Sequence, residues 1–273
     1  MSPTSSLLRF GLPDATQPLN LSTCACLLAA AELPTNTNES GNKNDDETEL
    51  VVRPYTPVST NAQSGSFDLL VKDYGPTHGR FSHFLCETMA VGDTVDFKHI
   101  PFNVKIQASS FLRDGGGAAA AATNHILMLA GGTGITPMVQ ALHAILGDDD
   151  AAENNKTTSS TTHVTLLYGN QTSQDILAKD LLDRWQSEYS DRFTVHHVLS
   201  KEQPSSSWAG FRGLIDKDMI EVTRTDKDME YDWVFVCGPP PMYEALCGPR
   251  DEPEQITGVL AELGYTAKEV YKF

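Results

Sequence analysis

The spacing of apolar and polar residues divides the chain into two parts. Residues 1–112 contain short runs of β-branched and aromatic residues that partly alternate with polar ones, with turn residues between them: "LVVRPYTPV", "SFDLLVKDY" and "VGDTVDFKHI". The segment "FSHFLCETMA" instead repeats its apolar residues at helical spacing. Several short strands with one helix predict a small antiparallel β-barrel.

From His125 onward, apolar runs alternate with helical patterns. The predicted buried strands are "HILMLA", "VTLLYG", "TVHHVLS" and "DWVFVCG". Helices are expected at 137–146, 175–189, near 214–221 and at 240–247, and a late helix in "QITGVLAELG" should end at Gly264. Near-continuous apolar strands separated by helices predict a doubly wound parallel sheet, covered on both faces, over residues 125–273.

Three polar segments lack such periodicity, namely residues 35–48, 113–124 and 147–163. We expect loops there. The low-complexity segment "RDGGGAAAAATN" (113–124) is predicted to link a barrel domain, residues 1–112, to the domain that begins at His125.

The chain is strongly acidic, with 36 Asp and Glu against 20 Lys and Arg. This balance disfavours nucleic acid and anionic membranes as main partners, and solubility is its plainest explanation. No apolar run reaches the length of a membrane span. The N-terminus also lacks the basic start and long apolar segment of a secretory signal. We therefore expect a cytoplasmic chain without a membrane segment.

Five cysteines are present: Cys24, Cys26, Cys86, Cys237 and Cys247. Their number is odd and their spacing does not match a zinc site, so we expect free thiols in a reducing compartment and no metal centre. Cys24-Ala25-Cys26 is predicted to belong to a strand.

A glycine-rich turn lies in "HILMLAGGTGITPMVQALHAIL", residues 125–146. Ligands of doubly wound sheets bind beyond the carboxyl ends of the strands, and glycines there permit φ > 0 and close approach of a ligand to the backbone. Pro137 suits the first helical turn and Thr136 can cap the helix. The helix should then bury Met138, Ala141, Leu142 and Ile145. A packed turn without a ligand is the alternative.

A second stretch with candidate chemistry is "VFVCGPPPM", residues 234–242. A predicted strand ends there in a cysteine, a glycine and three prolines. Prolines fix φ and remove backbone donors, so they build a rigid wall. A lone buried cysteine is usually structural. At the ligand end of a strand, however, Cys237 is a candidate site residue.

The barrel domain contributes two more stretches. In "RPYTPVS" (53–59), alternation along a strand points Arg53 and Tyr55 to one face and Thr56 to the other. Arginine offers a fork of donors for phosphate and tyrosine a flat apolar face, although a surface arginine beside a core tyrosine would look the same. In "GRFSHFL" (79–85), Gly79 and Ser82 lie where a helix begins, a place that favours an anion.

Together and in this order, the four stretches resemble the ferredoxin–NADP reductase superfamily, and within it the NADH–cytochrome b5 reductase branch. That branch carries R-P-Y-T-P, a G-x-x-S phosphate loop, G-G-T-G-I-T-P-M and C-G-P-P-P-M, and it ends in an aromatic residue, as "VYKF" does here. The resemblance extends from about Leu8 to Phe273. It implies an FAD-binding barrel followed by a nicotinamide-nucleotide domain.

The resemblance also assigns residues to FAD. Arg53 would pair with the pyrophosphate, Tyr55 would pack along the flavin, and the Thr56 hydroxyl would approach the reactive N5 edge. The other residues implied at the FAD site are Pro54, Lys72, Tyr74, Gly79, Arg80, Phe81 and Ser82.

A second set of residues is implied at the nicotinamide nucleotide. Gly132 and Thr133 would let it approach closely, and Thr136 would lie between the flavin and the nicotinamide. Ser200 and Lys201 would meet the adenosine ribose. The remaining cofactor-binding residues would be Cys237, Gly238, Pro239, Met242 and Phe273. Thr56, Thr136 and Cys237 are the residues expected nearest to the reaction.

The implied activity is electron transfer. Hydride would pass from NAD(P)H to FAD, and electrons would leave singly for a haem protein such as cytochrome b5. Two alternatives stay open: the reductase component of another system, such as a nitrate-reductase-like diaphorase, and a non-catalytic nucleotide sensor. NADH is expected ahead of NADPH with weak discrimination, because Ser200 occupies a place where NADH-selective members often carry an acid.

The sequence departs from the family pattern in three places. The first barrel strand should precede Leu8, where few residues remain, so we expect a truncated or rebuilt barrel edge. The N-terminal membrane anchor of the family is not found in this sequence. The segment "FKHIPFNVK" (97–105) replaces a glycine-containing turn, so contacts to the adenine end of FAD are expected to differ.

Overall fold

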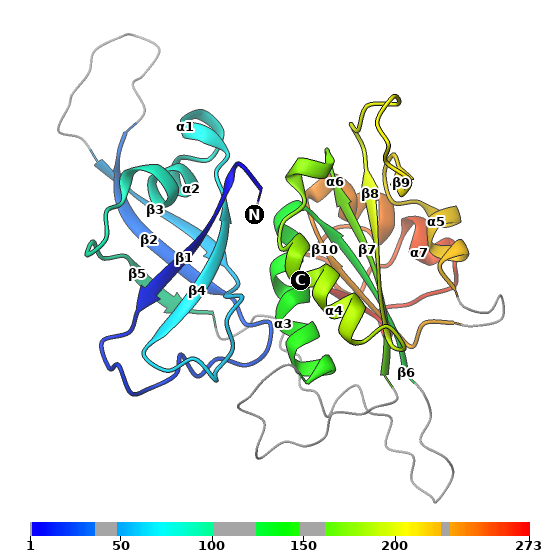
Figure 1. Cartoon of the computed structure of the whole chain (residues 1–273), viewed down its shortest axis with the longest axis horizontal. Helices are drawn as coiled ribbons and strands as arrows, with labels where there is room; N and C mark the ends of the chain where they lie inside the picture. The colour runs from blue at the N-terminus through cyan, green and yellow to red at the C-terminus, as the bar shows by residue number, and fades with distance from the viewer. Residues whose placement is uncertain (1, 36–47, 101–123, 148–161, 225–229) are drawn as a thin grey trace, which may run out of the picture.

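The computed structural model describes residues 2–35, 48–100, 124–147, 162–224 and 230–273. Figure 1 shows an antiparallel β domain beside a domain built on a parallel sheet. Most of the three predicted loop segments lies outside the described residues, including 113–123 of the predicted linker. Its last residue, Asn124, begins a strand.

The N-terminal domain contains five described strands, all paired antiparallel, which confirms the predicted class. Strand β1 (Ser5–Gly11) pairs with β4 (Ser66–Lys72), and β2 (Leu27–Pro34) lies between β3 (Thr48–Tyr55) and β5 (Asp96–His99). The first described strand therefore contains Leu8 and does not precede it. The assignment of Cys24-Ala25-Cys26 to a strand was wrong, because Cys24 lies in a turn with φ 63° and Ala25 and Cys26 are irregular residues that precede β2.

The helix predicted in this domain begins one residue earlier than expected, and its second half is a π-helix. It comprises α2 (Arg80–His83) and a π-helical turn, Phe84–Thr88, and is preceded by the short α1 (Gly75–His78). Phe81 and Leu85 are buried against β2, β3 and β4. The helix thus closes one end of the apolar core of the β domain.

The C-terminal domain is a six-stranded parallel sheet of order β11-β10-β6-β7-β8-β9. The strands are β6 (Asn124–Gly131), β7 (Thr162–Asn170), β8 (Phe193–Leu199), β9 (Phe211–Arg212), β10 (Trp233–Cys237) and β11 (Val270–Lys272). The side chains of Ile126 to Leu129 are fully buried. Such near-continuous burial is what helices on both faces of a parallel sheet require.

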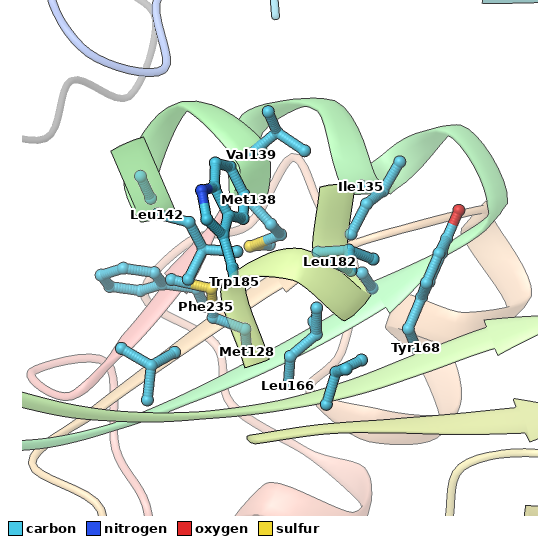
Figure 2. Close-up of a cluster of buried hydrophobic side chains, with 14 of the residues drawn as sticks. Met128, Ile135, Met138, Val139, Leu142, Leu166, Tyr168, Leu182, Trp185 and Phe235 are labelled. Atoms are coloured by element: carbon cyan, nitrogen blue, oxygen red, sulfur yellow. The ribbon is translucent and has the colours of Figure 1, made fainter. Parts of the chain in front are cut away.

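Two groups of helices cover this sheet. On one face lie α3 (Ile135–Leu146) and α4 (Lys179–Glu188), and on the other α5 (Lys217–Val222), α6 (Pro240–Leu246) and α7 (Gly258–Glu262). Figure 2 shows the first face, where side chains of α3 and Trp185 of α4 pack over Met128 and Leu166. Each fully buried Leu, Ile or Met side chain stabilises the fold by roughly 1.5–3 kcal/mol.

Two helices of this domain have other bounds than those predicted. The helix expected at 175–189 begins only at Lys179, because Ala178 is left-handed (φ 54°). The late helix begins at Gly258, and Gly264 (φ 88°) follows its end. Within the described ranges, no helix combines the length and the apolar character needed to cross a membrane.

Candidate functional site

A cavity of about 810 Å³ opens between the two domains. This volume lies within the range of cofactor and ligand pockets, about 300–1,000 Å³. Of the site residues predicted from the sequence, only Lys201 does not line this cavity. The residues that line it are Arg53, Pro54, Tyr55, Thr56, Lys72, Tyr74, Gly79, Arg80, Phe81, Ser82, Gly132, Thr133, Thr136, Ser200, Cys237, Gly238, Pro239, Met242 and Phe273. Four stretches that are far apart in the chain therefore meet around one space.

Strand β3 delivers the first wall of the cavity. Arg53 is exposed and its Nη1 donates to the carbonyl of Val52 at 2.8 Å. The Tyr55 ring lies 6.1 Å from the ring of Phe81, centroid to centroid. Burial raises the pKa of Tyr55 well above its ordinary value, so its hydroxyl is protonated at neutral pH. The wall thus offers one guanidinium that forms no ion pair with a described residue and one neutral aromatic ring.

The turn around Gly79 is packed too tightly for any side chain. A Cβ on Gly79 would lie 2.5 Å from both Ser82 Oγ and Tyr74 Cβ. The Ser82 hydroxyl donates to the Gly79 carbonyl at 2.9 Å. Arg80 is held by the Glu49 carboxylate and the Pro34 carbonyl. This turn therefore brings backbone, a buried hydroxyl and a fixed cation to the cavity.

Two of the contacts between the β domain and the sheet domain at the cavity are made by predicted cofactor residues. Lys72 Nζ lies 3.0 Å from Asp175 Oδ1. The half-exposed Tyr74 places its hydroxyl 3.4 Å from Thr133 Oγ1. Both predicted cofactor residues thus also contact the neighbouring domain.

The glycine loop after β6 differs from the prediction at its helix start. Gly132–Gly134 form a 3₁₀ turn and Gly134 is the N-cap of α3, so the proposed cap at Thr136 was wrong. Thr136 lies inside the helix because the 3₁₀ turn supplies its first turn. Its hydroxyl donates to the Thr133 carbonyl at 3.2 Å. The predicted burial of Met138, Ala141, Leu142 and Ile145 is confirmed.

Gly132 and Gly134 have different roles in this loop. A Cβ on Gly134 would lie 2.1 Å from the Cys237 carbonyl oxygen, so only glycine fits between the loop and β10. Gly132 has φ 53°, and a Cβ there would meet nothing within 4 Å. Gly134 therefore serves packing, whereas Gly132 leaves open space at the cavity.

Cys237 ends β10 beside the prolines. Burial raises the pKa of its thiol to about 11, and interaction with the Tyr243 hydroxyl opposes that rise. The thiol is therefore neutral at physiological pH. A Cβ on Gly238 would lie 2.5 Å from Met242 Sδ, so this turn also requires glycine.

Sequence reasoning missed several residues of the cavity wall. They include Cys24, Cys26, Gly169, Asn170, Gln171, Gly213, Leu214, Ile215 and Arg250. Gly169 to Gln171 follow from the rule that ligands lie beyond the carboxyl ends of parallel strands, since they end β7. Cys24 carried no local signal. Its Sγ donates to the Pro137 carbonyl at 3.1 Å, across 113 positions of sequence.

The residues present fit a flavin dinucleotide and a nicotinamide nucleotide. Tyr55 and Tyr74 present aromatic surface to planar rings, and Arg53 presents donors to a phosphate. Gly132 and Gly213 are both left-handed glycines with open space where a Cβ would stand, so backbone is accessible to a ligand at two strand ends. Among the described residues, no cluster of His, Cys, Asp and Glu could hold a metal ion.

Comparison with known families agrees with this geometry. The model described as "Oxidoreductase FAD-binding domain" matches residues 1–101, and "Oxidoreductase NAD-binding domain" matches residues 128–248. The order of these two matches confirms the predicted order of a flavin-binding β domain and a nucleotide-binding parallel sheet.

Individual relatives match over the whole chain. It is 37% identical to NADH-cytochrome b5 reductase 2 of Coccidioides immitis, over 97% of this chain and 71% of the relative. It is 35% identical to NADH-cytochrome b5 reductase 2 of Yarrowia lipolytica, over 100% and 82%.

A solved structure shares both fold and sequence with the chain. The cytochrome b5 reductase domain of Ulva prolifera nitrate reductase superposes with a TM-score of 0.72 at 30% identity, covering 100% of this chain and 93% of that domain. With two-domain fold, cavity and sequence in agreement, the chain belongs to the cytochrome b5 reductase family of FAD- and NAD-binding flavoenzymes.

Proposed function

We propose that this chain oxidises NADH at a bound FAD and passes the electrons singly to a haem protein of the cytochrome b5 class. The observation that carries the proposal is one cavity lined by Thr56 of the β domain and by Thr136 and Cys237 of the sheet domain. The chemistry that FAD supplies when bound is acceptance of a hydride and release of two electrons one at a time. The names of the relatives favour NADH as donor and cytochrome b5 as acceptor.

On the β-domain side, the role of the protein is to hold an anionic, planar cofactor. Lys72 and Arg80 are each paired with a carboxylate, those of Asp175 and Glu49. Arg53 makes no ion pair with a described residue and lines the same wall. We therefore assign Arg53 to the pyrophosphate of FAD, since an unpaired guanidinium gains most from a phosphate. Tyr55 would pack along the flavin ring.

On the sheet-domain side, the role is to place the nicotinamide ring. The open backbone at Gly132 admits the nucleotide, while Cys237 and Gly238 form a wall that the prolines stiffen. Fixing donor and acceptor in one geometry supplies much of the rate of a hydride transfer. No side chain has to act as acid or base, so the eight histidines need no catalytic role, although exposed His78 lines the cavity.

The test is an anaerobic titration of the purified flavoprotein with NADH, followed by acceptors. A yellow protein that bleaches with NADH and then reduces cytochrome b5 supports the proposal. A colourless protein that still binds nucleotide supports the sensor alternative and contradicts ours.

The likeness to a nitrate reductase domain favours a second candidate acceptor. That domain is named a cytochrome b5 reductase domain within a larger enzyme, so this chain would serve as the diaphorase of a separate partner. The haem domain of a nitrate reductase therefore joins cytochrome b5 in the acceptor panel. The acceptor with the higher kcat/KM decides between the two.

We also infer a cytoplasmic location. The described residues contain no disulfide, and the thiols of Cys24 and Cys247 are buried, as expected for a reducing compartment. Imaging of a chain tagged at its C-terminal side, through a linker that leaves Phe273 in place, would contradict this by showing the protein inside an organelle.

A further inference from the structure

The hydroxyl of Tyr243 connects the end of β10 to the last residue of the chain. Tyr243 lies in α6, six residues after Cys237, and only 2% of it is exposed. Its hydroxyl shares its single proton between the Val236 carbonyl, at 3.2 Å, and a backbone oxygen of Phe273. The N–H of Phe273 donates to the same Val236 carbonyl at 3.0 Å. The strand end and the C-terminus are thus joined at one point.

This connection passes from one face of the sheet to the other. The Tyr243 ring packs in the apolar cluster beneath α5, α6 and α7. The Phe273 ring belongs to the opposite cluster and meets Phe235 edge-on, with 5.7 Å between centroids. Phe273 also lines the cavity, whereas Tyr243 does not. The hydroxyl therefore fixes a residue of the cavity from behind the sheet.

The Val236 carbonyl that accepts from this hydroxyl belongs to the residue directly before Cys237. Interaction with Tyr243 lowers the pKa of the Cys237 thiol against the rise caused by burial. The Cys237 backbone is in turn wedged against the glycine loop, where the Cβ of a residue at Gly134 would collide with the Cys237 carbonyl oxygen. The hydroxyl of Tyr243 thus bonds Phe273 directly and reaches Cys237 through the neighbouring Val236 carbonyl.

We infer that Tyr243 is a positioning residue for hydride transfer, because its hydroxyl sets where Cys237 and Phe273 stand in the nucleotide wall of the cavity. The inference rests on the proposed function, in which nicotinamide lies against that wall. Without the hydroxyl, Phe273 keeps its backbone bond to Val236, but its own backbone oxygen and the Val236 carbonyl beside Cys237 both lose a donor.

Tyr243→Phe removes the hydroxyl and keeps the ring. Tyr265→Phe is the matched control. Its hydroxyl is buried in the same domain, accepts the Tyr231 N–H at 3.1 Å and lies outside the cavity wall. Both variants are purified with FAD, and their flavin content and melting temperature are recorded, so that loss of folded protein is separated from loss of rate.

The first readout is the rate of flavin reduction per bound FAD at saturating NADH, measured by stopped flow. We expect Tyr243→Phe to lower it about tenfold, because hydride transfer depends steeply on geometry. Tyr265→Phe should stay within about twofold of the wild type, since a buried hydroxyl remote from the cavity affects stability only. A wild-type rate in Tyr243→Phe overturns the inference.

The second readout needs no NADH. Alkylation of Cys237 by iodoacetamide is followed by mass spectrometry as a function of pH in the FAD-loaded protein. Loss of the Tyr243 hydroxyl should move the midpoint of this profile to higher pH, and Tyr265→Phe should leave it in place. A wild-type profile in Tyr243→Phe also overturns the inference. If the wild type fails to oxidise NADH, the proposed function fails, while this profile still reports whether Tyr243 acts on Cys237.

Discussion

Lys72 of the β domain and Asp175 of the sheet domain form an ion pair across the domain boundary. Lys72 Nζ lies 3.0 Å from Asp175 Oδ1, and the side chains are only 18% and 25% exposed. The Asp175 carboxylate also accepts the N–H and the hydroxyl of Thr172. Because Lys72 lines the cavity, a residue assigned to the flavin by resemblance also helps to fix one domain against the other.

Asp175→Asn should weaken this link, with a loss of about 1 kcal/mol at pH 7. Burial alone would raise the pKa of Asp175, but hydrogen bonds from Thr172 and Lys72 hold it below its ordinary value. A carboxyl of this kind stabilises the fold above the unfolded pKa, about 3.9, and the effect is lost as pH falls through the folded pKa. The difference from wild type should therefore shrink below about pH 4.

Urea unfolding midpoints between pH 3 and pH 7 measure this difference. Asp183→Asn is the control, because Asp183 pairs with Lys179 within the exposed surface of α4. We expect a smaller loss there, about 0.3–0.5 kcal/mol. A difference for Asp175→Asn that is the same at pH 3 and pH 7 would refute the assigned role of the ion pair.

Arg53→Ala should weaken retention of FAD by about 1.5–3 kcal/mol, through loss of a charge-assisted phosphate contact. The measurement is the dissociation constant of FAD, from the fluorescence of flavin released on dilution. Arg9→Ala serves as the control. Arg9 is paired with Asp68 at 2.7 Å and lies outside the cavity wall. Equal FAD affinity in the two variants would contradict the assignment of Arg53 to the phosphate site.

The two glycines of the loop after β6 should respond differently to alanine. Gly134→Ala places a Cβ 2.1 Å from the Cys237 oxygen, so we expect about 1–3 kcal/mol of lost stability from forced backbone movement. Gly132→Ala meets no atom within 4 Å, but its φ of 53° costs about 1–2 kcal/mol, and its methyl group enters the cavity.

Gly132→Ala should therefore remain folded and show a raised KM for NADH. The main effect of Gly134→Ala should instead be a lower stability of the sheet domain. Urea unfolding and steady-state kinetics on both variants separate these effects. The packing account of Gly134 fails if Gly134→Ala unfolds at the wild-type urea concentration.

Four strands of the parallel sheet, β6, β7, β8 and β10, were predictable because each leaves a local signature, whereas the short edge strands β9 and β11 were not predicted. The runs around Met128, Leu166 and Phe235 are apolar almost throughout, and helices on both faces bury them. The convergence of Arg53, Gly132 and Cys237 on one cavity came from matched motifs, and the strand-end rule supports it for the sheet domain.

Other features of the site had no such signal. Lys72 and Asp175 are 103 positions apart in the sequence. Lysine and aspartate are also common on protein surfaces, so neither residue indicated that it would form an ion pair between domains. The start of α3 was misplaced because a 3₁₀ turn at Gly132–Gly134 and a helical turn have similar sequences. The hydroxyl of Tyr243 reaches Phe273 only through tertiary packing. The sequence therefore predicted the helix that contains Tyr243 but not this hydrogen bond.

We propose that nucleotide choice depends on the segment after β8. Ser200 lines the cavity, with its hydroxyl donating to the Asn170 carbonyl at 3.3 Å, whereas Lys201 does not line it. The neighbouring Glu202 carboxylate accepts the Ser173 N–H at 2.8 Å, which lowers its pKa and keeps it charged at neutral pH. Lys201, whose cation would favour a 2′-phosphate, and Glu202 both lie outside the cavity wall, but the Glu202 carboxylate, two residues after Ser200, is held by Ser173.

We expect NADH to be preferred over NADPH, but by less than about a thousandfold in kcat/KM, or about 4 kcal/mol. Ser200→Asp should raise the preference, because a carboxylate in the cavity wall repels the 2′-phosphate directly. Glu202→Gln should lower it. Glu188→Gln, at the exposed end of α4, should leave it unchanged. A wild-type preference above a thousandfold, or identical ratios in Ser200→Asp and wild type, would mean that the 2′ position is read elsewhere in the cavity.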